Sequence, residues 1–477
     1  MKRNTSFLIL VLLTGYSCFS QSVGIGTLSP DITSKLDIVS NSQGVLLPRM
    51  TTVQRKAIPS PTTGLLVFDL DKGTLYLFDG GLWRPLIFKN ENQLDPIVRE
   101  PADGAANALF GGSVDIDGDY AVIGATLDDI GTNINQGSVY VFFRGTAGWV
   151  QQAKLTAADG AANDAFGYNV AIDGNYVVVG VYGDDIGANT DQGSAYVFLR
   201  SGTTWTQQAK LVASDGASGD FFGGAVAIDF TRAVIGAYKD DIGANTDQGS
   251  AYVFTRSGAT WTQEAKILSN DGVTNDHFGY SVTAGLNGDL VLVGAPNRLI
   301  NYQGQGAVYM FGHSGTTWFQ QLRIFVGEGQ LGDGLGSSIC FDDNYLVAGA
   351  PFRTEGANAY QGAAYIWQYT GGFTYQTKLL NPDGAGGDKF GYAVSINNNY
   401  ILVGAHEKNE NGNTWQGASY LFKRNGTTWP LARKIDDGDG EANGFFGQAV
   451  SISGLNLIIG AYGKNNTKGQ VSFLSME

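Results

Sequence analysis

Short hydrophobic runs alternate with glycine-rich polar turns over most of the chain. In residues 166–211 the runs are FGYNVAI (166–172), YVVVG (176–180), SAYVFLR (194–200) and WTQQAKL (205–211). They are separated by a DGN turn, by a longer acidic loop and by an SGTT turn. Short runs rich in β-branched and aromatic residues, bounded by turn residues, predict β-strands. The pattern therefore predicts four short strands connected in sequence as an antiparallel meander.

This unit of four strands recurs along the chain. Each copy begins with an aromatic residue or Leu followed by Gly, and the copies are spaced by 55 to 57 residues, with starts at 110, 166, 222, 278, 335, 390 and 446. One stretch, DDIGANTDQGSAYVF, occurs identically at 184–198 and 240–254. A constant period of this size predicts an array of equal structural units.

The hydrophobic pattern also indicates how the units are arranged. The two middle strands of each unit are almost continuously apolar, which is typical of a sheet covered on both faces. A radial stack of sheets covers both faces of every sheet, so we predict an all-β fold, a seven-bladed β-propeller of four-stranded antiparallel blades over residues 91–477. The last unit ends at Glu477, one strand short. Residues of about 92–99 are expected to supply that strand and close the ring, because an unpaired edge would otherwise remain.

Two short motifs mark the repeats. Phe-Gly occurs at Phe110-Gly111, Phe166-Gly167, Phe222-Gly223, Phe278-Gly279, Phe390-Gly391 and Phe446-Gly447, and Gly-Ala-Pro closes the second strand at 294–296 and 349–351. We expect Phe to wedge between blades, with Gly allowing close backbone approach. The chain from about residue 92 resembles FG-GAP repeat proteins, the units of integrin α-chain propellers and of many secreted bacterial proteins. The resemblance implies a β-propeller whose longer loops form the ligand side.

The longer loops are expected to share one face of the propeller. In a meander, the connection between the second and third strands lies at the same end as the connection to the next blade. That end collects acidic segments, whereas the opposite end has short turns flanked by arginine and lysine. The candidate ligand residues on the acidic loop face are Asp128, Asp129, Asp184, Asp185, Asp240 and Asp241.

The same acidic loops raise the question of calcium. Asp185, Asn189 and Asp191 place oxygen atoms at three points of one loop, and Asp241, Asn245 and Asp247 repeat them. Calcium prefers six to eight oxygen ligands, so such a loop could supply part of a shell. The alternative is that these side chains cap turns. The calcium loops of the family normally lie between the first two strands, where this chain has only a tight turn, so the family's metal residues do not carry over.

Composition narrows the possible functions. The formal net charge of −14 argues against nucleic acid as a partner and allows basic partners or cations. The three histidines, His277, His313 and His406, form no recognisable catalytic set with serine or carboxylate. We therefore expect no required cofactor and a non-catalytic propeller that binds an extracellular protein or glycan through its acidic loop face. A polysaccharide-acting enzyme with carboxylates at the propeller mouth and a purely structural envelope protein are the alternatives.

The first 90 residues predict export and a spacer. Residues 1–20 combine Lys2 and Arg3 with the apolar run FLILVLL (7–13) and a small residue at Ser20, as in a signal peptide. The protein is therefore expected to be secreted or displayed on the cell surface, and a lipid anchor at Cys18 is the less favoured alternative. No later segment is long and apolar enough to span a membrane. Residues 21–90 predict a small β-rich module, with a helix capped by Thr51, that resembles the stalk-like segments of phage tail fibres and could form oligomers.

Overall fold

The computed structural model describes two compact units, which lie within residues 1–91 and 92–477. The described residues are 23–25, 36–38, 40, 42, 45–71, 74–78, 80–81, 83–86, 97–146, 148–300, 304–342, 344–438 and 440–476. The expected signal peptide (1–20), with Cys18, lies outside them. Among the described residues, no helix combines the length and the apolar character that crossing a membrane requires.

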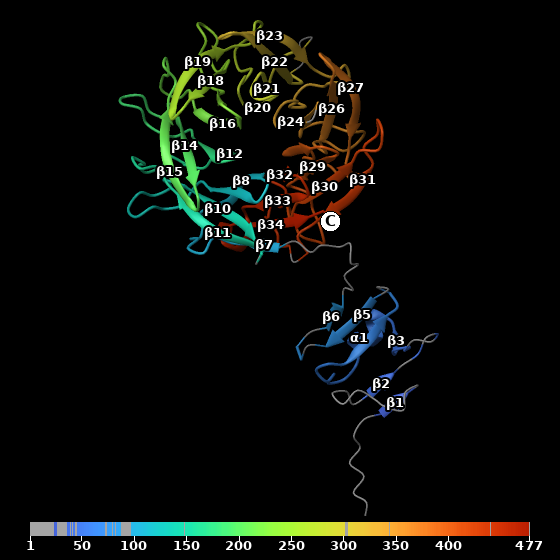
Figure 1. Cartoon of the computed structure of the whole chain (residues 1–477). Coiled ribbons are helices and arrows are strands. Elements are labelled where there is room, and N and C mark those ends of the chain that lie inside the picture. Colours follow the sequence, from blue (N-terminus) through green and yellow to red (C-terminus); the bar gives the residue numbers. More distant parts are fainter. Residues whose placement is uncertain are drawn as a thin grey trace, which may run out of the picture. The chain divides into compact units, whose positions relative to one another are not determined.

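The larger unit is a ring of seven four-stranded antiparallel sheets within the described residues (Figure 1), which confirms the predicted β-propeller. Blade 1 consists of β8 (Phe110–Asp117), β9 (Tyr120–Ala125), β10 (Ser138–Gly145) and β11 (Gly148–Leu155). Blade 2 consists of β12 (Asn169–Asp173), β13 (Tyr176–Val181), β14 (Ser194–Ser201) and β15 (Thr204–Leu211). Blade 3 consists of β16 (Phe222–Asp229), β17 (Arg232–Ala237), β18 (Ser250–Ser257) and β19 (Thr260–Ile267). Each blade runs from an inner first strand to an outer fourth strand.

The remaining four blades have the same strand order. Blades 4 and 5 consist of β20 (Ser281–Gly285), β21 (Leu290–Ala295), β22 (Ala307–Ser314) and β23 (Thr317–Ile324), and of β24 (Ile339–Asp342), β25 (Tyr345–Ala350), β26 (Ala363–Tyr369) and β27 (Phe373–Leu379). Blade 6 consists of β28 (Val394–Asn397), β29 (Tyr400–Ala405), β30 (Ala418–Lys423) and β31 (Leu431–Ile435). Blade 7 consists of β32 (Val450–Ser453), β33 (Asn456–Ala461), β34 (Gln470–Ser475) and β7 (Ile97–Arg99), with α2 (Lys464–Thr467) between β33 and β34.

The ring is closed by a strand from the beginning of the propeller. Strand β7 pairs antiparallel with β34, so that Arg99 lies opposite Val471 and Ile97 opposite Phe473. Arg99 also donates from Nε to the carbonyl oxygen of Trp149 in blade 1, at 2.8 Å. Both ends of the propeller sequence thus meet in blade 7, and the outer edge of β34 is covered.

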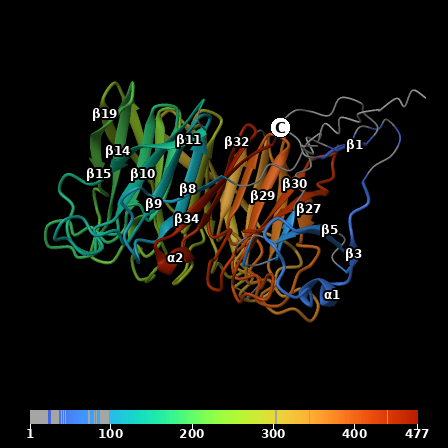
Figure 2. The ribbon, with the colours of Figure 1, turned by 90° about the horizontal axis from the view of Figure 1, so that it is seen from below.

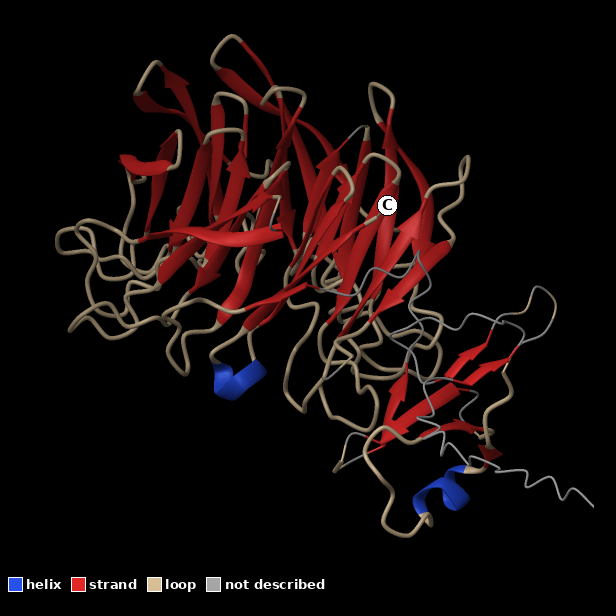
Figure 3. Cartoon of the chain, turned by 60° about the horizontal axis from the view of Figure 1, so that its bottom comes forward, coloured by secondary structure: helices blue, strands red, loops and turns tan. Residues whose placement is uncertain are grey.

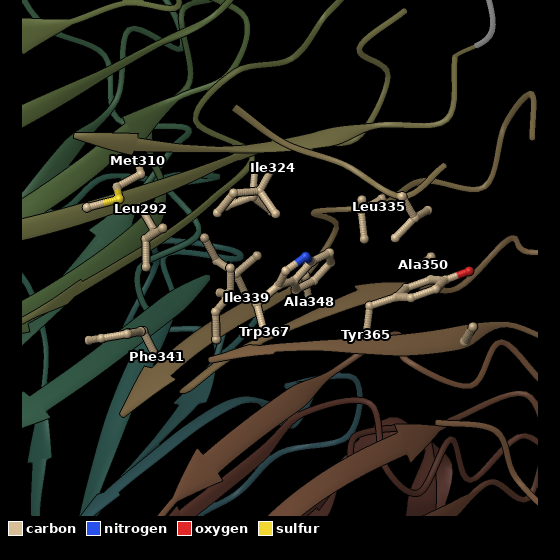
Figure 4. Close-up of a cluster of buried hydrophobic side chains, with 14 of the residues drawn as sticks. Leu292, Met310, Ile324, Leu335, Ile339, Phe341, Ala348, Ala350, Tyr365 and Trp367 are labelled. Atoms are coloured by element: carbon tan, nitrogen blue, oxygen red, sulfur yellow. The ribbon is translucent and has the colours of Figure 1, made fainter. Parts of the chain in front are cut away.

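The hydrophobic core lies between neighbouring blades. Figure 4 shows one such cluster, where Leu292 and Met310 of blade 4 lie with Phe341, Ala348 and Trp367 of blade 5. The aromatic members of the Phe-Gly pairs are fully buried. Gly223 follows one of them with φ +93°, and a Cβ there would lie 2.2 Å from the carbonyl oxygen of Ser194. Only glycine fits this approach between blades.

The repeated tryptophans on the outer strands pack against neighbouring blades. Trp205 of β15 donates from Nε1 to Oε1 of Gln152 in blade 1, at 3.0 Å, and meets Tyr120 edge to face. Trp149 is buried and stacks on Phe473 of blade 7, with ring centroids 4.4 Å apart. These contacts give the tryptophans a structural role and leave little ring surface for a ligand.

In the part of the smaller unit that the structure describes there are two short sheets and one helix. Its elements are β1 (Val23–Ile25) paired with β2 (Leu36–Ile38), and β3 (Arg49–Met50), α1 (Thr52–Lys56), β4 (Leu66–Asp69), β5 (Thr74–Phe78) and β6 (Trp83–Leu86). Thr51 caps α1 through a capping box with Gln54, as the sequence predicts. Arg55 forms a buried ion pair with Asp69 at 2.8 Å, and its guanidinium lies 3.7 Å from the centre of the Tyr76 ring. This pair fixes the helix on the β3–β6 sheet.

Candidate binding face

The long loops come together on one face of the propeller, which we call the loop face. It consists of the loops between the second and third strands and the loops that lead into the next blade. Backbone hydrogen bonds of 2.9 Å join these two sets of loops, from Asn163 to Ile134, Gly219 to Thr190 and Asn275 to Thr246. Figures 2 and 3 show α2 on this side, and Figure 3 shows short turns on the other.

The opposite face is held by its own hydrogen bonds. The backbone amide of Gly174 donates to Asp117 at 2.8 Å, that of Gly288 to Asp229 at 2.7 Å, and that of Asn398 to Asp342 at 2.9 Å. Each bond joins the first turn of one blade to that of its neighbour. These acidic side chains therefore bind neighbouring turns and tie adjacent blades together on the opposite face.

The six candidate carboxylates on the loop face fall into two groups. Asp129, Asp185 and Asp241 are exposed, whereas Asp128, Asp184 and Asp240 are buried. The buried three point into their blades, so only the exposed three present their carboxylates to solvent. The division follows from local structure, since adjacent residues in an extended loop point in different directions.

Each buried aspartate is the centre of a polar network within its blade. Asp184 accepts hydrogen bonds from Ser194 at 2.5 Å and from Tyr196 at 3.4 Å. Lys210 Nζ lies 2.8 Å from both Asp184 and Asp159. Burial lowers the pKa of Lys210, but the hydrogen bonds to the two carboxylates outweigh burial and hold the pKa above its usual range. The lysine therefore remains charged and supplies the cation that two carboxylates need.

Blades 1 and 3 repeat this network, whereas blades 4 to 7 invert its charge. Lys154 bridges Asp103 and Asp128, and Lys266 bridges Asp215 and Asp240. In the other four blades a cation stands where Asp184 stands, and it pairs with a buried carboxylate: Arg298 with Asp276 at 2.8 Å, Arg353 with Asp333 at 2.7 Å, Lys408 with Asp388 at 3.2 Å and Lys464 with Asp437 at 2.8 Å. The acidic character of the loop face is therefore concentrated in blades 1 to 3.

A group of aromatic side chains, which we call the first aromatic arc, lies on the loop face over blades 2 to 4. Its rings contact one another in sequence: Tyr168 and Tyr182 at 4.5 Å, Tyr182 and Phe221 at 5.2 Å, Phe221 and Tyr238 at 5.8 Å, and Tyr238 with both His277 at 5.6 Å and Tyr280 at 5.4 Å. Burial raises the pKa of Tyr280 to about 12, and nearby tyrosines add to the shift. These phenols are neutral at physiological pH.

A second aromatic arc lies over blades 6 and 7. Tyr392 contacts His406 at 3.9 Å, His406 contacts Phe445 at 6.1 Å, and Phe445 stacks on Tyr462 and Trp415 at 5.1 and 6.0 Å. Burial, followed by the charge of Lys389, lowers the pKa of His406 to about 3, so the imidazole is neutral. Both histidines of the loop face thus belong to aromatic packing.

The two arcs border the central cavity of the propeller. This cavity has a volume of about 420 Å³ and is lined by the inner strands of all seven blades, with Tyr168, Tyr238, Tyr280 and Tyr392 among the lining residues. Asp115 also lines it, and accepts hydrogen bonds from the Ile172 amide and the Ser451 hydroxyl. Burial raises the pKa of Asp115 to about 6. Tyrosines of both arcs therefore line a cavity that also contains the carboxyl group of Asp115.

Comparison with known protein families agrees with this geometry. Six segments match the FG-GAP repeat, at residues 100–142, 149–198, 205–254, 261–311, 373–422 and 429–472. The chain belongs to the FG-GAP repeat family. The FG-GAP match leaves out residues 312–372, which contain the first three strands of the repeat that begins at Leu335 instead of Phe. That repeat nevertheless forms blade 5, where Leu335 is fully buried in the place of the phenylalanine.

The part of this FG-GAP protein that precedes the propeller matches a second family. Residues 24–95 match a phage tail-like trimerisation region. No curated protein matches the chain. Among solved structures, one chain of "Crystal Structure of Mitotic Checkpoint Complex" is 10% identical, with a TM-score of 0.48 over 82% of this chain and 98% of that chain.

The FG-GAP loops that the sequence offers for calcium use their polar groups internally. Asp185 accepts a hydrogen bond from the Asp191 amide at 2.9 Å. The Asn189 amide group donates to Gln192 at 2.8 Å and to the carbonyl oxygen of Gly216 at 3.1 Å. Asp241, Asn245 and Asp247 repeat these bonds. Within the described ranges, no cluster of three or more acidic, histidine or cysteine side chains is arranged to hold a metal ion. The contacts support the turn-capping alternative.

Two FG-GAP repeats bury a second carboxylate close to the first. Asp164 of blade 2 and Asp220 of blade 3 are buried, and each lies near the inward-pointing aspartate of its own blade. Burial, with a contribution from Asp184 or Asp240, raises the pKa of each to about 6. The unfolded side chain has a pKa of 3.8, so the folded state binds protons more tightly. The charged form therefore destabilises the fold above pH 6, and the penalty disappears below pH 4.

We expect the double variant Asp164→Asn, Asp220→Asn to be more stable than the natural protein at about pH 7.5, by about 1 kcal/mol per site. Asparagine retains an acceptor for the Ala161 amide, which donates to Asp164 at 2.6 Å. The advantage should shrink as the pH falls and vanish below about pH 4, where the carboxyls are protonated in the unfolded as well as the folded state. Urea denaturation across this pH range measures both effects.

A matched control comes from blade 6, where the carboxylate equivalent to Asp164 and Asp220 forms an ion pair with a lysine. Asp388 accepts hydrogen bonds from the Ala385 amide at 2.9 Å and from Lys408 at 3.2 Å. Asp388→Asn should therefore lower stability at about pH 7.5, because it leaves the buried lysine with less compensation. Equal effects of the two substitutions would contradict the charge assignment.

Proposed function

We propose that this FG-GAP protein is a non-catalytic binding protein, secreted or displayed on the cell surface, that recognises an extracellular protein or glycan through its loop face. FG-GAP β-propellers often serve in binding or adhesion. The single observation that carries the proposal is the division of the loop face into chemically different sectors on one repeated scaffold.

The loops between the second and third strands keep the same backbone hydrogen bond in several blades, whereas the residue at one position of these loops varies in chemical type. In blades 1 to 3 this position holds Asn135, Asp191 and Asp247, and in blades 5 and 6 it holds Tyr360 and Trp415. The backbone amide at this position makes the same hydrogen bond in both sectors. The Asp191 amide donates to the Asp185 side chain at 2.9 Å, and the Trp415 amide donates to the Asn409 side chain at 2.9 Å. A repeat array that keeps its backbone and varies its exposed side chains is typical of a recognition surface.

We further propose that the protein works as an oligomer formed through its first unit, because residues 24–95 match a trimerisation region. Three propellers in one assembly would bind a repetitive surface far more tightly than one propeller, since the second and third contacts become intramolecular. Light scattering on the purified chain should give about three times the chain mass of 50.6 kDa. A monomer mass at all concentrations contradicts this part of the proposal.

The binding function is tested by probing the purified chain against arrays of extracellular proteins and glycans. We expect one class of ligand to be retained, and a variant with asparagine at Asp129, Asp185 and Asp241 or alanine at Tyr360 and Trp415 to lose it. A control variant on the opposite face, Phe230→Ala, should bind normally, because Phe230 is 60% exposed on a turn of that face. Retention that depends on added calcium and is lost with a chelator would support a calcium role for the acidic loops.

Three results would overturn the proposal. Turnover of a glycan, abolished by one carboxylate substitution, would make the protein an enzyme. If binding survives all loop-face substitutions but is lost when the opposite face is substituted, the ligand binds the opposite face and the proposed surface is wrong. An absence of ligands in both arrays would favour a structural envelope protein.

A further inference from the structure

Three rings of the second aromatic arc form a stack, which we call the aromatic shelf. Trp415 comes from the loop between β29 and β30, Phe445 from the loop between β31 and β32, and Tyr462 follows β33. The planes of Phe445 and Tyr462 differ by 6°, and those of Trp415 and Phe445 by 27°. Trp415 is 44% exposed although Phe445 covers one side of its ring. Phe445 and Tyr462 are half-buried, so the shelf presents mainly the ring of Trp415 to solvent.

The backbone at the shelf is in a conformation that its side chains disfavour. Trp415 has φ +52° and Phe445 has φ +54°. Blades 1 to 3 hold Asn135, Asp191 and Asp247 at the place of Trp415, with φ of +53°, +51° and +51°. Asparagine and aspartate tolerate this left-handed region, whereas a bulky residue there is an outlier. An exposed ring gains little from burial, so folding alone does not explain why tryptophan stands at this position.

Polar groups surround the shelf. Asn409, Asn411, Thr414 and Asn443 are exposed and belong to the two loops that carry Trp415 and Phe445. The nearby charged pair of Lys389 and Glu407, with Nζ and Oε1 2.6 Å apart, is internally neutralised. The surroundings of the shelf thus provide amide and hydroxyl groups without a dominant charge.

A second exposed ring lies in the adjacent blade. Tyr360 of blade 5 occupies the position of Trp415, has φ +55° and is 56% exposed. Its carbonyl oxygen accepts from the Lys389 amide at 3.0 Å, as that of Trp415 accepts from the Phe445 amide at 3.0 Å. The same strained placement of an aromatic ring thus occurs in two successive blades. A ligand with a repeated unit could contact both.

We propose that the aromatic shelf binds a neutral, pyranose-containing oligosaccharide, and that Tyr360 extends the site along the sugar chain. The apolar face of a pyranose ring suits a flat aromatic surface, and its hydroxyls suit the surrounding amides. The exposed ring of Trp415, with Phe445 nearly parallel to it, offers one flat face, whereas a box of perpendicular rings would enclose a quaternary ammonium group. Nucleobases stack equally well, but the net charge of −14 opposes nucleic acid. The inference rests on the proposed binding function and names the ligand class of its loop face.

The test compares Trp415→Asn with the natural protein. Asparagine is the residue that blade 1 uses at this position, so the variant should fold with equal or higher thermal stability. The probe is an array of oligosaccharides of glucose, galactose, mannose and N-acetylglucosamine, followed by calorimetry on the retained compound. We expect affinity to fall by about tenfold or more, because aromatic stacking contributes on this scale. Tyr360→Asn should weaken long oligosaccharides more than short ones, and Phe230→Ala should have no effect.

The possible outcomes separate this inference from the proposed function. If a glycan binds with equal affinity to Trp415→Asn but not to the variant lacking Asp129, Asp185 and Asp241, the shelf is not the sugar site and the loop face still binds. If the array retains only proteins, or if the shelf binds a proline-rich peptide and no sugar, the ligand class is wrong. If nothing binds on the loop face, the inference and the proposed function fail together.

Discussion

Replacing Lys210 with methionine is expected to lower the free energy of unfolding by about 3 kcal/mol, the lower end of the range for breaking a buried ion pair. Lys210 is the cation between Asp159 and Asp184, and the Asp184 side chain is only 7% exposed. Without the ammonium group, the buried Asp184 carboxylate keeps only its hydrogen bonds from Ser194 and Tyr196 and has no cation beside it. The lysine side chain is itself 25% exposed, and water reaching the site reduces the effect. Urea denaturation at neutral pH measures the loss.

Two further variants show whether charge or packing is responsible. Adding Asp184→Asn to Lys210→Met removes the uncompensated carboxylate, so the double variant should recover part of the lost stability. Lys423→Met is the control, because Lys423 is exposed on a different blade and its replacement should change stability by less than about 0.5 kcal/mol. A double variant that is less stable than Lys210→Met alone would show that packing of the lysine stem, and not its charge, stabilises the blade.

The propeller could be predicted because its determinants are local and repeated. The spacing of the Phe-Gly pairs fixes the length of a unit, and the apolar middle strands require cover on both faces. The smaller unit was predicted in outline, as a β-rich module with a helix capped by Thr51, and the structure contains both. In each of these cases, one segment and its nearest neighbours determine the structure.

The sequence did not predict which aspartate of each adjacent pair, such as Asp184 and Asp185, points into its blade. Asp184 and Asp185 are adjacent and chemically identical, yet one is buried and the other exposed. A signal does exist in the repeats, because the position of Asp184 becomes Arg298, Arg353, Lys408 and Lys464 in later blades. A position that alternates between carboxylate and cation indicates an ion pair, whereas a ligand-facing position has no reason to invert its charge.

The aromatic arcs were missed because no single repeat contains one. Trp415 and Phe445 belong to the repeat that begins at residue 390, but they are 30 residues apart, and Tyr462 belongs to the next repeat. Only the packing of one blade on the next brings the three rings together. Each ring viewed in its own segment resembles an ordinary loop residue. The detectable signal is the aromatic side chain at a loop position that other repeats give to Asn or Asp, the residues that tolerate positive φ.

Replacing Phe222 with alanine is expected to lower the free energy of unfolding by about 3 to 5 kcal/mol, the usual cost of emptying a core site of this size. Phe222 opens β16, is fully buried, and meets Tyr252 edge to face with centroids 5.3 Å apart. It lies in the core between blades 2 and 3, with Val197 and Leu211 of blade 2. Its loss therefore weakens the packing of one blade on the next as well as that of its own sheet.

The same substitution at Phe230 gives the matched control, because that ring is 60% exposed and its removal leaves no cavity. The closed ring adds a second expectation, namely a single unfolding transition that shifts as a whole. The pairing of β7 with β34 closes the ring, so blades 2 and 3 remain connected around the other side of the ring even when their shared interface is weakened. Neither blade can therefore separate on its own. In an open array of repeats, weakening one interface lets the segments unfold separately. Two resolved transitions for Phe222→Ala, with the earlier one confined to blades 1 and 2, would therefore contradict closure through β7.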